Sequence, residues 1–323
     1  MVLVLLITAI VSSVLVLRRT ESAGGIPRGD DPFSGVRLFV DPGSSAAQAV
    51  ASLDRSNPAA AALLRKIASR PGGIWFGPWI PATQVAGAVR TVMHRAAARD
   101  SMPLLVLYAF PYRGCEHGGG AGSAAAGYES WIGQVAAGIG AGKAAVILEP
   151  DALAEYVRLG CLSPAEQGDR LTVLHRAVER LARLPHAAVY LDAGNSAWQP
   201  AAVMASLLLA AGVAEIRGFS VNVSNYNSTT AEESYGDTVS ARLHAAHYVI
   251  DTSRNGVATA TTWCNPPGQA LGTPPTVRTG NPRVDALLWI KPPGTSDGTC
   301  NGGPPAGVFW PSYALGLAAN ARW

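Results

Sequence analysis

Residues 144–161 read AAVILEPDALAEYVRLGC. The first five are apolar and suit a strand that is buried on both faces. Glu149, Pro150 and Asp151 follow where that strand should end. Proline cannot donate a hydrogen bond to a neighbouring strand, so it marks the strand's end. The segment therefore predicts a buried strand with two carboxyl groups at its carboxyl end.

Similar apolar runs alternate with segments of helical spacing, such as residues 81–100 and 165–184. This alternation predicts an α/β fold, in which helices surround a parallel sheet. Seven or eight such units favour one domain built as a closed barrel. The runs lie at residues 36–40, 73–77, 103–110, 144–149, 187–192, 216–223, 247–251 and 284–290.

Composition and motifs argue against several classes of protein. The chain has 323 residues, of which 15% are charged, and its net charge is +3. No more than two Lys or Arg residues are adjacent, so we expect no nucleic-acid surface. Residues 138–145 (GIGAGKAA) lack the first glycine and the Ser/Thr of a phosphate-binding loop. There is no G-x-S-x-G or H-E-x-x-H motif, and the histidines show no ligand spacing, so we expect no metal site.

The N-terminus has the composition of an export segment. Residues 1–17 (MVLVLLITAIVSSVLVL) are almost wholly apolar. We expect a signal peptide or membrane anchor at residues 1–20, a linker at 21–35 and one folded domain at 36–323. A buried N-terminal element, or a start that truncates a longer signal, is the alternative. Export would make the protein secreted or envelope-anchored, touching a membrane only through this segment.

The sequence contains four cysteines, which behind an export segment indicate two disulfides. Three pairings are possible. The chain order favours Cys115–Cys161 and Cys264–Cys300, because each pair then brackets one candidate site loop. Four buried thiols are the alternative, and the spacing argues against a metal site.

Polar and aromatic residues gather where the apolar runs end. In a parallel barrel these ends share one mouth, where active sites are built. Carboxylates and amides bind sugar hydroxyls, and tryptophan faces stack on sugar rings, so the pattern favours a carbohydrate-active enzyme. The residues concerned are Tyr108, Arg113, Glu149, Asp151, Asp192, Asn195, Trp198, Asn222, Asn225, Asp251, Lys291 and Asp297.

Five segments resemble glycoside hydrolase family 6, the cellobiohydrolases and endo-β-1,4-glucanases. They read VILEPDALA, YLDAGNSAW, VIDTSRNG, WCNPPGQALG and DALLWIKPPGTSDG, and the resemblance extends from about residue 36 to the end of the chain. It implies a distorted barrel of seven parallel strands that hydrolyses β-1,4-glucan with inversion. It also implies no cofactor, and the same two disulfides that the order of the cysteines favours.

The resemblance assigns roles to individual residues. Asp151 matches the general acid, which needs a raised pKa that a neighbour such as Glu149 can provide, although a structural role for Glu149 is equally plausible. Tyr108 matches the tyrosine beneath the distorted sugar, and Asp297 is the candidate base. The expected substrate-binding residues are Trp75, Asn195, Trp198, Asn225, Trp263 and Lys291.

Three positions depart from the family pattern. Gly114 stands where the family has an aspartate that supports the acid and the nucleophilic water. Asn195 replaces a histidine and Thr295 replaces a glutamate, both of which contact substrate in the family. The loop after Cys115 is also about one residue shorter than in the family pattern. Reduced activity or an altered substrate follows as an expectation.

Three hypotheses remain at this point. The first is an exported, monomeric, inverting β-1,4-glucanase of the open-cleft endo type, because residues 115–127 suit an open cleft. The second is a family member that binds β-glucan polysaccharide or oligosaccharide with impaired hydrolysis, because of Gly114. The third is a hydrolase of another envelope β-glucan, which an anchored N-terminus would favour.

Overall fold

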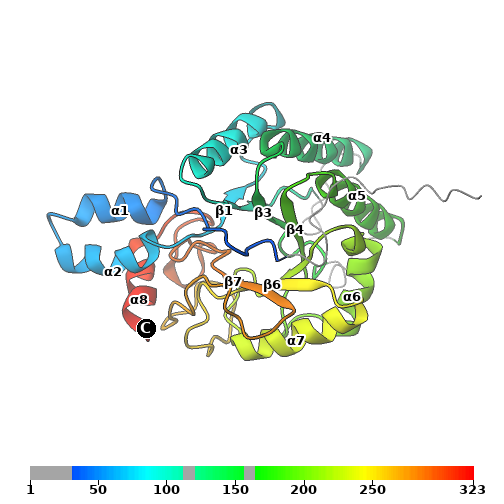
Figure 1. The fold of residues 1–323 in the computed structure, drawn as a ribbon. Helices are drawn as coiled ribbons and strands as arrows, with labels where there is room; N and C mark the ends of the chain where they lie inside the picture. The colour runs from blue at the N-terminus through cyan, green and yellow to red at the C-terminus, as the bar shows by residue number, and fades with distance from the viewer. Residues whose placement is uncertain (1–30, 112–120, 156–163) are drawn as a thin grey trace, which may run out of the picture.

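The computed structural model describes residues 31–111, 121–155 and 164–323. Seven parallel strands form one sheet, and each strand pairs with the next strand in the chain. The sheet curls into the distorted α/β barrel that the resemblance implies (Figure 1). The strands are β1 (Ile74–Phe76), β2 (Leu104–Leu107), β3 (Ala144–Leu148), β4 (Ala187–Asp192), β5 (Gly218–Val221), β6 (His247–Asp251) and β7 (Val284–Leu288).

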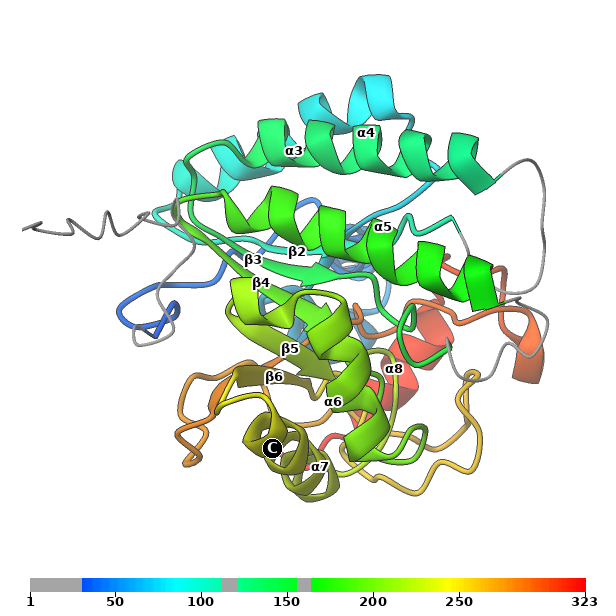
Figure 2. The same ribbon diagram turned by 90° about the vertical axis from the view of Figure 1, so that its right-hand side faces the viewer.

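Helices cover the outside of the sheet in two groups. Figure 2 shows α3, α4 and α5 side by side over one half of the sheet and α6 and α7 over the other. A separate group of α1, α2 and α8 packs at one flank (Figure 1). The bounds are α1 (Ser45–Leu53), α2 (Pro58–Ala68), α3 (Ala82–Ala97), α4 (Ala121–Ile139), α5 (Pro164–Ala182), α6 (Ala201–Ala210), α7 (Thr229–Arg242) and α8 (Pro311–Asn320).

Two expectations from the apolar runs were wrong in detail. Residues 36–40 form no strand and contribute a single bridge, between Leu38 and Met102. The barrel is also not closed by a ladder, because β1 and β7 are the two edges of the described sheet. A backbone hydrogen bond from Gly73 N to Trp289 O, 2.9 Å long, joins these edges. Residues 36–40 therefore make too few backbone pairings with a neighbouring strand to form an eighth strand.

Side chains alternate between two cores along each strand. On β2, Leu105 packs against the outer helices, and Val106 packs inside the barrel with Ile147 of β3. Both kinds of side chain are fully buried. This explains why β2 and β3 are apolar throughout, since both of their faces are buried.

A buried polar cluster lies where the inner core meets the starts of the later strands. Asp285 accepts hydrogen bonds from Tyr190 Oη (2.6 Å) and from Arg217 Nε and Nη2 (2.8 and 2.7 Å). His247 Nδ1 lies 2.9 Å from the same carboxylate. The cluster links β4, β5, β6 and β7 through one carboxylate, so it fixes their relative positions.

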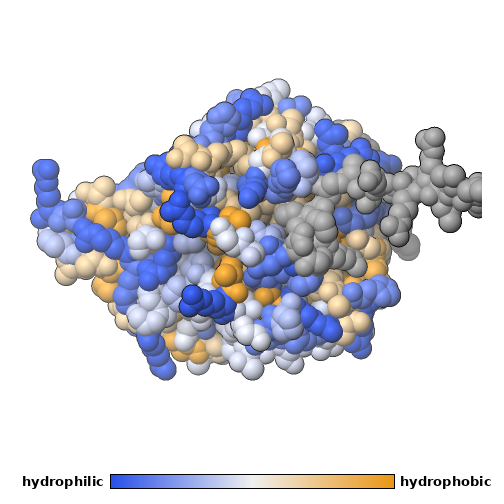
Figure 3. All heavy atoms as spheres, in the orientation of Figure 1, coloured by the Kyte–Doolittle hydropathy of each residue, from blue (hydrophilic) through white to orange (hydrophobic). Residues whose placement is uncertain are grey.

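The face formed by the amino ends of the strands mixes hydrophilic side chains with small apolar patches (Figure 3). A hollow of about 690 Å³ lies among residues that precede β2 and β3, including Asp100 and Lys143. It contains none of the strand-end carboxylates, so it is separate from the chemistry discussed below. Across the described ranges, no helix is both long and apolar enough to cross a bilayer.

Replacing Asp285 with alanine should lower the free energy of unfolding by about 3–5 kcal/mol, because Arg217 would stay buried without a counter-charge. Urea unfolding at neutral pH measures this loss. Glu129→Ala is the control, since its ion pair with Arg176 lies near the surface and should leave the midpoint almost unchanged. A loss below about 1 kcal/mol for Asp285→Ala would contradict the role of the cluster.

Candidate active site

The turn after β3 presents the two carboxyl groups that the sequence places there. Glu149 and Asp151 both have positive φ angles, 52° and 73°. Glu149 is fully buried and accepts hydrogen bonds from the backbone amides of Ala109 and Phe110, at 3.0–3.1 Å. Its carboxylate therefore ties the end of β3 to the end of β2, which is the structural role considered for it. Asp151 is partly exposed at the mouth.

Asp192, at the end of β4, is the carboxyl that lies directly below Asp151. Its Oδ2 accepts hydrogen bonds from the amides of Asp151 (2.9 Å) and Gly194 (3.0 Å), and its Oδ1 accepts one from Ser220 Oγ (2.9 Å). Burial and then the charge of Asp151 raise the pKa of Asp192 to about 8, despite these hydrogen bonds. The proton that Asp192 keeps near neutral pH therefore depends on its burial and on the charge of its neighbour Asp151.

Asp297 has the opposite electrostatic environment. Arg254 Nη1 lies 2.8 Å from its Oδ2, and Lys291 Nζ lies 3.1 Å from its Oδ1. Burial alone would raise the pKa of Asp297, but the charges of Arg254 and Lys291 outweigh it and lower the pKa. Asp297 is thus ionised near neutral pH, as a base must be, although a lowered pKa makes it a weak proton acceptor.

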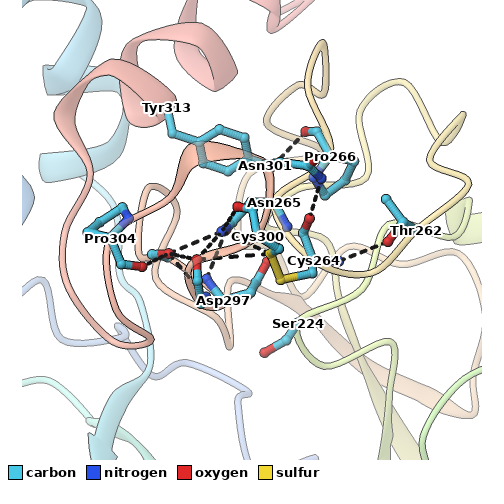
Figure 4. Close-up of a disulfide and its surroundings, with 12 residues drawn as sticks. Ser224, Thr262, Cys264, Asn265, Pro266, Asp297, Cys300, Asn301, Pro304 and Tyr313 are labelled. Atoms are coloured by element: carbon cyan, nitrogen blue, oxygen red, sulfur yellow. Dashed lines mark hydrogen bonds between the residues drawn. A yellow bond between two sulfur atoms is a disulfide. The ribbon is translucent and has the colours of Figure 1, made fainter.

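The late loop that carries Asp297 is fastened to a second loop (Figure 4). Cys264 and Cys300 form a disulfide, which is the second of the two expected pairs. Asn265 N donates to Asp297 Oδ2 (3.1 Å), and Asp297 N donates to Asn265 Oδ1 (2.9 Å). Cys115 and Cys161 lie outside the described residues, as do Arg113 and Gly114.

Aromatic residues line the β1 and β2 side of the mouth. The rings of Trp75 and Tyr108 lie 5.3 Å apart at 57°. Trp75 Nε1 donates to Ile290 O (2.9 Å), and Lys291 Nζ lies 5.7 Å from the centre of the indole. The charge of Asp151 acts on Lys291 as well, so these groups share one site.

The other expected substrate-binding residues differ in exposure. Trp263 precedes the disulfide and is 63% exposed, and Trp198 is half-buried above Gly194. Asn195 is buried, and its Oδ1 accepts hydrogen bonds from Ala197 N and Asn227 Nδ2, both 3.0 Å long. Its amide oxygen thus orders the loop after β4.

Asn225 and Thr295 complete the residues singled out from the sequence. Asn225 is partly exposed, and its Nδ2 donates to Val223 O (2.9 Å). Thr295 forms an isolated bridge with Phe309, which ties the late loop to the chain before α8. Both therefore help to shape the loops around the mouth, whether or not they also touch substrate.

Arg254 and Tyr226 belong to the site but were not among the predicted site residues. Arg254 is fully buried and lies 4.3 Å from the Tyr226 ring, while Tyr226 Oη donates to Asp297 Oδ2 (3.3 Å). The sequence contained one signal, since Arg254 lies in VIDTSRNG. Its partner is 43 residues away, so the pairing itself could not be found from spacing.

One cluster outside the mouth has metal-ligand chemistry. The ligand atoms of His175, Glu179 and Glu215 lie within 4.8 Å of one another. His175 Nε2 lies 2.7 Å from Glu215 Oε1. These residues are on α5 and the 3₁₀ helix Val213–Glu215, on the outer layer of the fold. They are remote from the strand-end carboxylates and play no part in that chemistry.

The comparisons with known proteins agree with the geometry. The profile of glycosyl hydrolases family 6 matches residues 33–321. Endoglucanase A of Cellulomonas fimi is 43% identical over 295 residues, covering 90% of this chain and 62% of that protein. Endoglucanase 1 of Streptomyces halstedii is 42% identical over 86% of this chain and 87% of its own length.

Among solved structures, the endoglucanase Cel6 from Mycobacterium tuberculosis has a TM-score of 0.84 and 43% identity. The match covers 90% of this chain and 99% of that one, which is in complex with methyl-cellobiosyl-4-deoxy-4-thio-β-D-cellobioside. Endoglucanase CEL6B from Humicola insolens has a TM-score of 0.78 and 27% identity, covering 91% and 99% of the two chains.

The raised pKa of Asp192 predicts a pH-dependent stability. The unfolded carboxyl ionises near its ordinary pKa of 3.8, whereas the native one keeps its proton up to about 8. The contribution of Asp192 to the free energy of unfolding is therefore complete below pH 3.8. It is lost as the pH rises from 3.8 to about 8. Relative to Asp192→Asn, the wild type should lose up to about 1.4 kcal/mol of unfolding free energy per pH unit.

Urea unfolding of both proteins at pH 5.0 and pH 7.5 measures this difference. Asparagine keeps the shape of the side chain, and its effects on packing and hydrogen bonding are the same at both pH values, so they cancel in the comparison. A difference between the proteins that is equal at both pH values would show that Asp192 does not hold its proton.

Proposed function

Because the chain belongs to glycosyl hydrolases family 6, we propose that it hydrolyses β-1,4-glucan internally, with inversion and with Asp151 as the general acid. The observation that carries this proposal is the grouping at the mouth of Asp151, Asp192 and the Arg254–Asp297–Lys291 cluster. Such a site has a proton to donate and an ionised carboxylate to accept one, as inverting hydrolysis requires. The names of the relatives support endo cleavage.

Each group has a defined task in this mechanism. Asp151 gives its proton to the glycosidic oxygen, and Asp192 orients it by accepting a hydrogen bond from the Asp151 backbone amide. The Trp75 and Tyr108 rings form the apolar wall for the sugar at the bond that breaks. Asp297 holds Lys291 in place and accepts the proton of the attacking water. The chain itself supplies both acid and base chemistry.

Export is a second part of the proposal. We propose that residues 1–20 direct the protein out of the cytoplasm, as a cleaved signal or as an anchor. The Cys264–Cys300 disulfide supports this, since such bonds persist in oxidising compartments. N-terminal sequencing of the protein from the culture medium and from the membrane fraction tests it, and exclusive recovery from the cytosol would contradict it.

Impaired hydrolysis is the alternative that one residue favours. Gly114 occupies the position at which the family carries a carboxylate. The loss of one acid–base contribution, typically about 10²–10⁴-fold, slows catalysis without abolishing it. We therefore propose a slow hydrolase in preference to a pure binding protein.

Asp151→Ala should reduce the release of reducing sugar from carboxymethyl-cellulose by at least about 100-fold, because general acid catalysis is lost. Endo cleavage also predicts that viscosity falls before much reducing sugar appears. The fold of the variant is checked by its urea midpoint. Unchanged activity in a folded Asp151→Ala protein would refute the assignment of the acid.

Gly114→Asp should raise the activity on soluble β-glucan by up to about 100-fold and shift its pH profile, because a carboxylate is restored. Gly114→Asn is the matched control, since it adds the same bulk without the charge. An equal response in both variants would show that charge at position 114 has no catalytic effect.

A further inference from the structure

Trp79 is an exposed tryptophan that the mechanism above does not use. It lies in the turn that follows β1, where Ile80 N donates to Gly77 O at 3.0 Å. Its side chain is 60% exposed, although apolar rings of this size are usually buried. An exposed indole beside an active site marks a candidate ligand contact.

The alternation of side chains along β1 shows which way this indole faces. A Cβ on Gly73 would lie 2.9 Å from Val106 Cγ2, and Trp75 packs against the same inner core. Phe76 packs in the outer core. Successive residues of a strand point to opposite faces, so position 77 faces the interior as 73 and 75 do.

The Trp79 ring occupies the space in front of Gly77. A Cβ on Gly77 would lie 2.2 Å from Cζ3 and 2.4 Å from Cη2 of Trp79. The indole therefore lies on the inner side of the β1 rim, one inward-facing position beyond Trp75. Gly77 has to be a glycine for the ring to lie there, because any larger residue would displace it.

The order of the groups across the mouth gives the ring a place along the cleft. Asp151 follows β3, Tyr108 follows β2 and Trp75 lies on β1, and the strands neighbour one another in this order. Trp79 follows Trp75 at the carboxyl end of the same strand, β1, which is an edge of the sheet. A glucan chain that leaves Asp151 over Tyr108 and Trp75 meets Trp79 next.

We propose that Trp79 stacks on a further glucosyl unit of the substrate, on the side of Trp75 remote from Asp151. This rests on the proposed function. The pyranose ring offers an apolar face of C–H groups to the indole, which buries apolar area on both partners. Long β-1,4-gluco-oligosaccharides reach this position, and short ones bound around Asp151 do not.

Binding without turnover tests the proposal. The Asp151→Asn chain is titrated calorimetrically with cellohexaose and with cellotriose, with and without Trp79→Ala. The added substitution should weaken cellohexaose binding about tenfold and cellotriose binding less than about twofold. Trp79→Tyr should keep cellohexaose affinity within about threefold, because its ring can still stack, and Gly77→Ala should reproduce the loss.

Trp323 provides the control for the loss of an exposed indole. Trp323→Ala removes another exposed indole, one that packs on Trp289 and Arg70, and should leave both affinities unchanged. Unchanged cellohexaose binding in Trp79→Ala would overturn this subsite alone, and an equal loss for both probes would contradict its outer position. Failure of the Asp151→Asn chain to bind either probe would overturn the proposed function, and the subsite with it.

Discussion

The Asp297 carboxylate, held between Arg254 and Lys291, is the interaction on which the mouth of the barrel depends. Arg254 follows β6, Lys291 follows β7, and Asp297 belongs to the late loop. Removing one member of such a buried cluster leaves an uncompensated charge, which costs several kcal/mol. The loops that carry Lys291 and Trp263 contain little regular structure, so this cluster and the Cys264–Cys300 disulfide determine their conformation.

The same mouth holds two carboxyl environments of opposite character. At the end of β4, burial and the charge of Asp151 raise the pKa of Asp192, so that this carboxyl keeps a proton. On the opposite side, two cations keep Asp297 ionised. Separated acid and base environments are how one site carries out both steps of hydrolysis near neutral pH. The fold provides both because its parallel strands end at one rim.

Much of the fold could be predicted from the sequence, because seven of the apolar runs each form a strand, and all of these strands except β1 are almost wholly buried. The run at 36–40 looked the same, but pairing depends on distant partners and there it finds only Met102. The helical flank of α1, α2 and α8 was not predicted, since its packing joins segments from the two ends of the domain.

The site was predictable where chemistry lies at a strand end, as for Asp151, Trp75 and Lys291. The site residues whose role depends on being buried against a distant partner could not be predicted. Arg254 looks like any arginine until its burial against Asp297 is known. Glu149 could have been a neighbour of the acid or a structural group, and its hydrogen bonds to two backbone amides, which show the structural role, are not visible in the sequence. Trp79 could be proposed as a sugar-stacking residue only after the position of its ring over Gly77 was known.

If the residues at this rim act together as proposed, the chain hydrolyses its substrate with inversion of the anomeric centre. Proton NMR of cellohexaose during the first minutes of hydrolysis tests it most directly, because the anomeric signals report the configuration of the new reducing end before mutarotation. Inverting hydrolysis of a β-linkage should release the α-anomer first. Initial release of the β-anomer, or no product from a folded protein at any pH from 4 to 9, would contradict it.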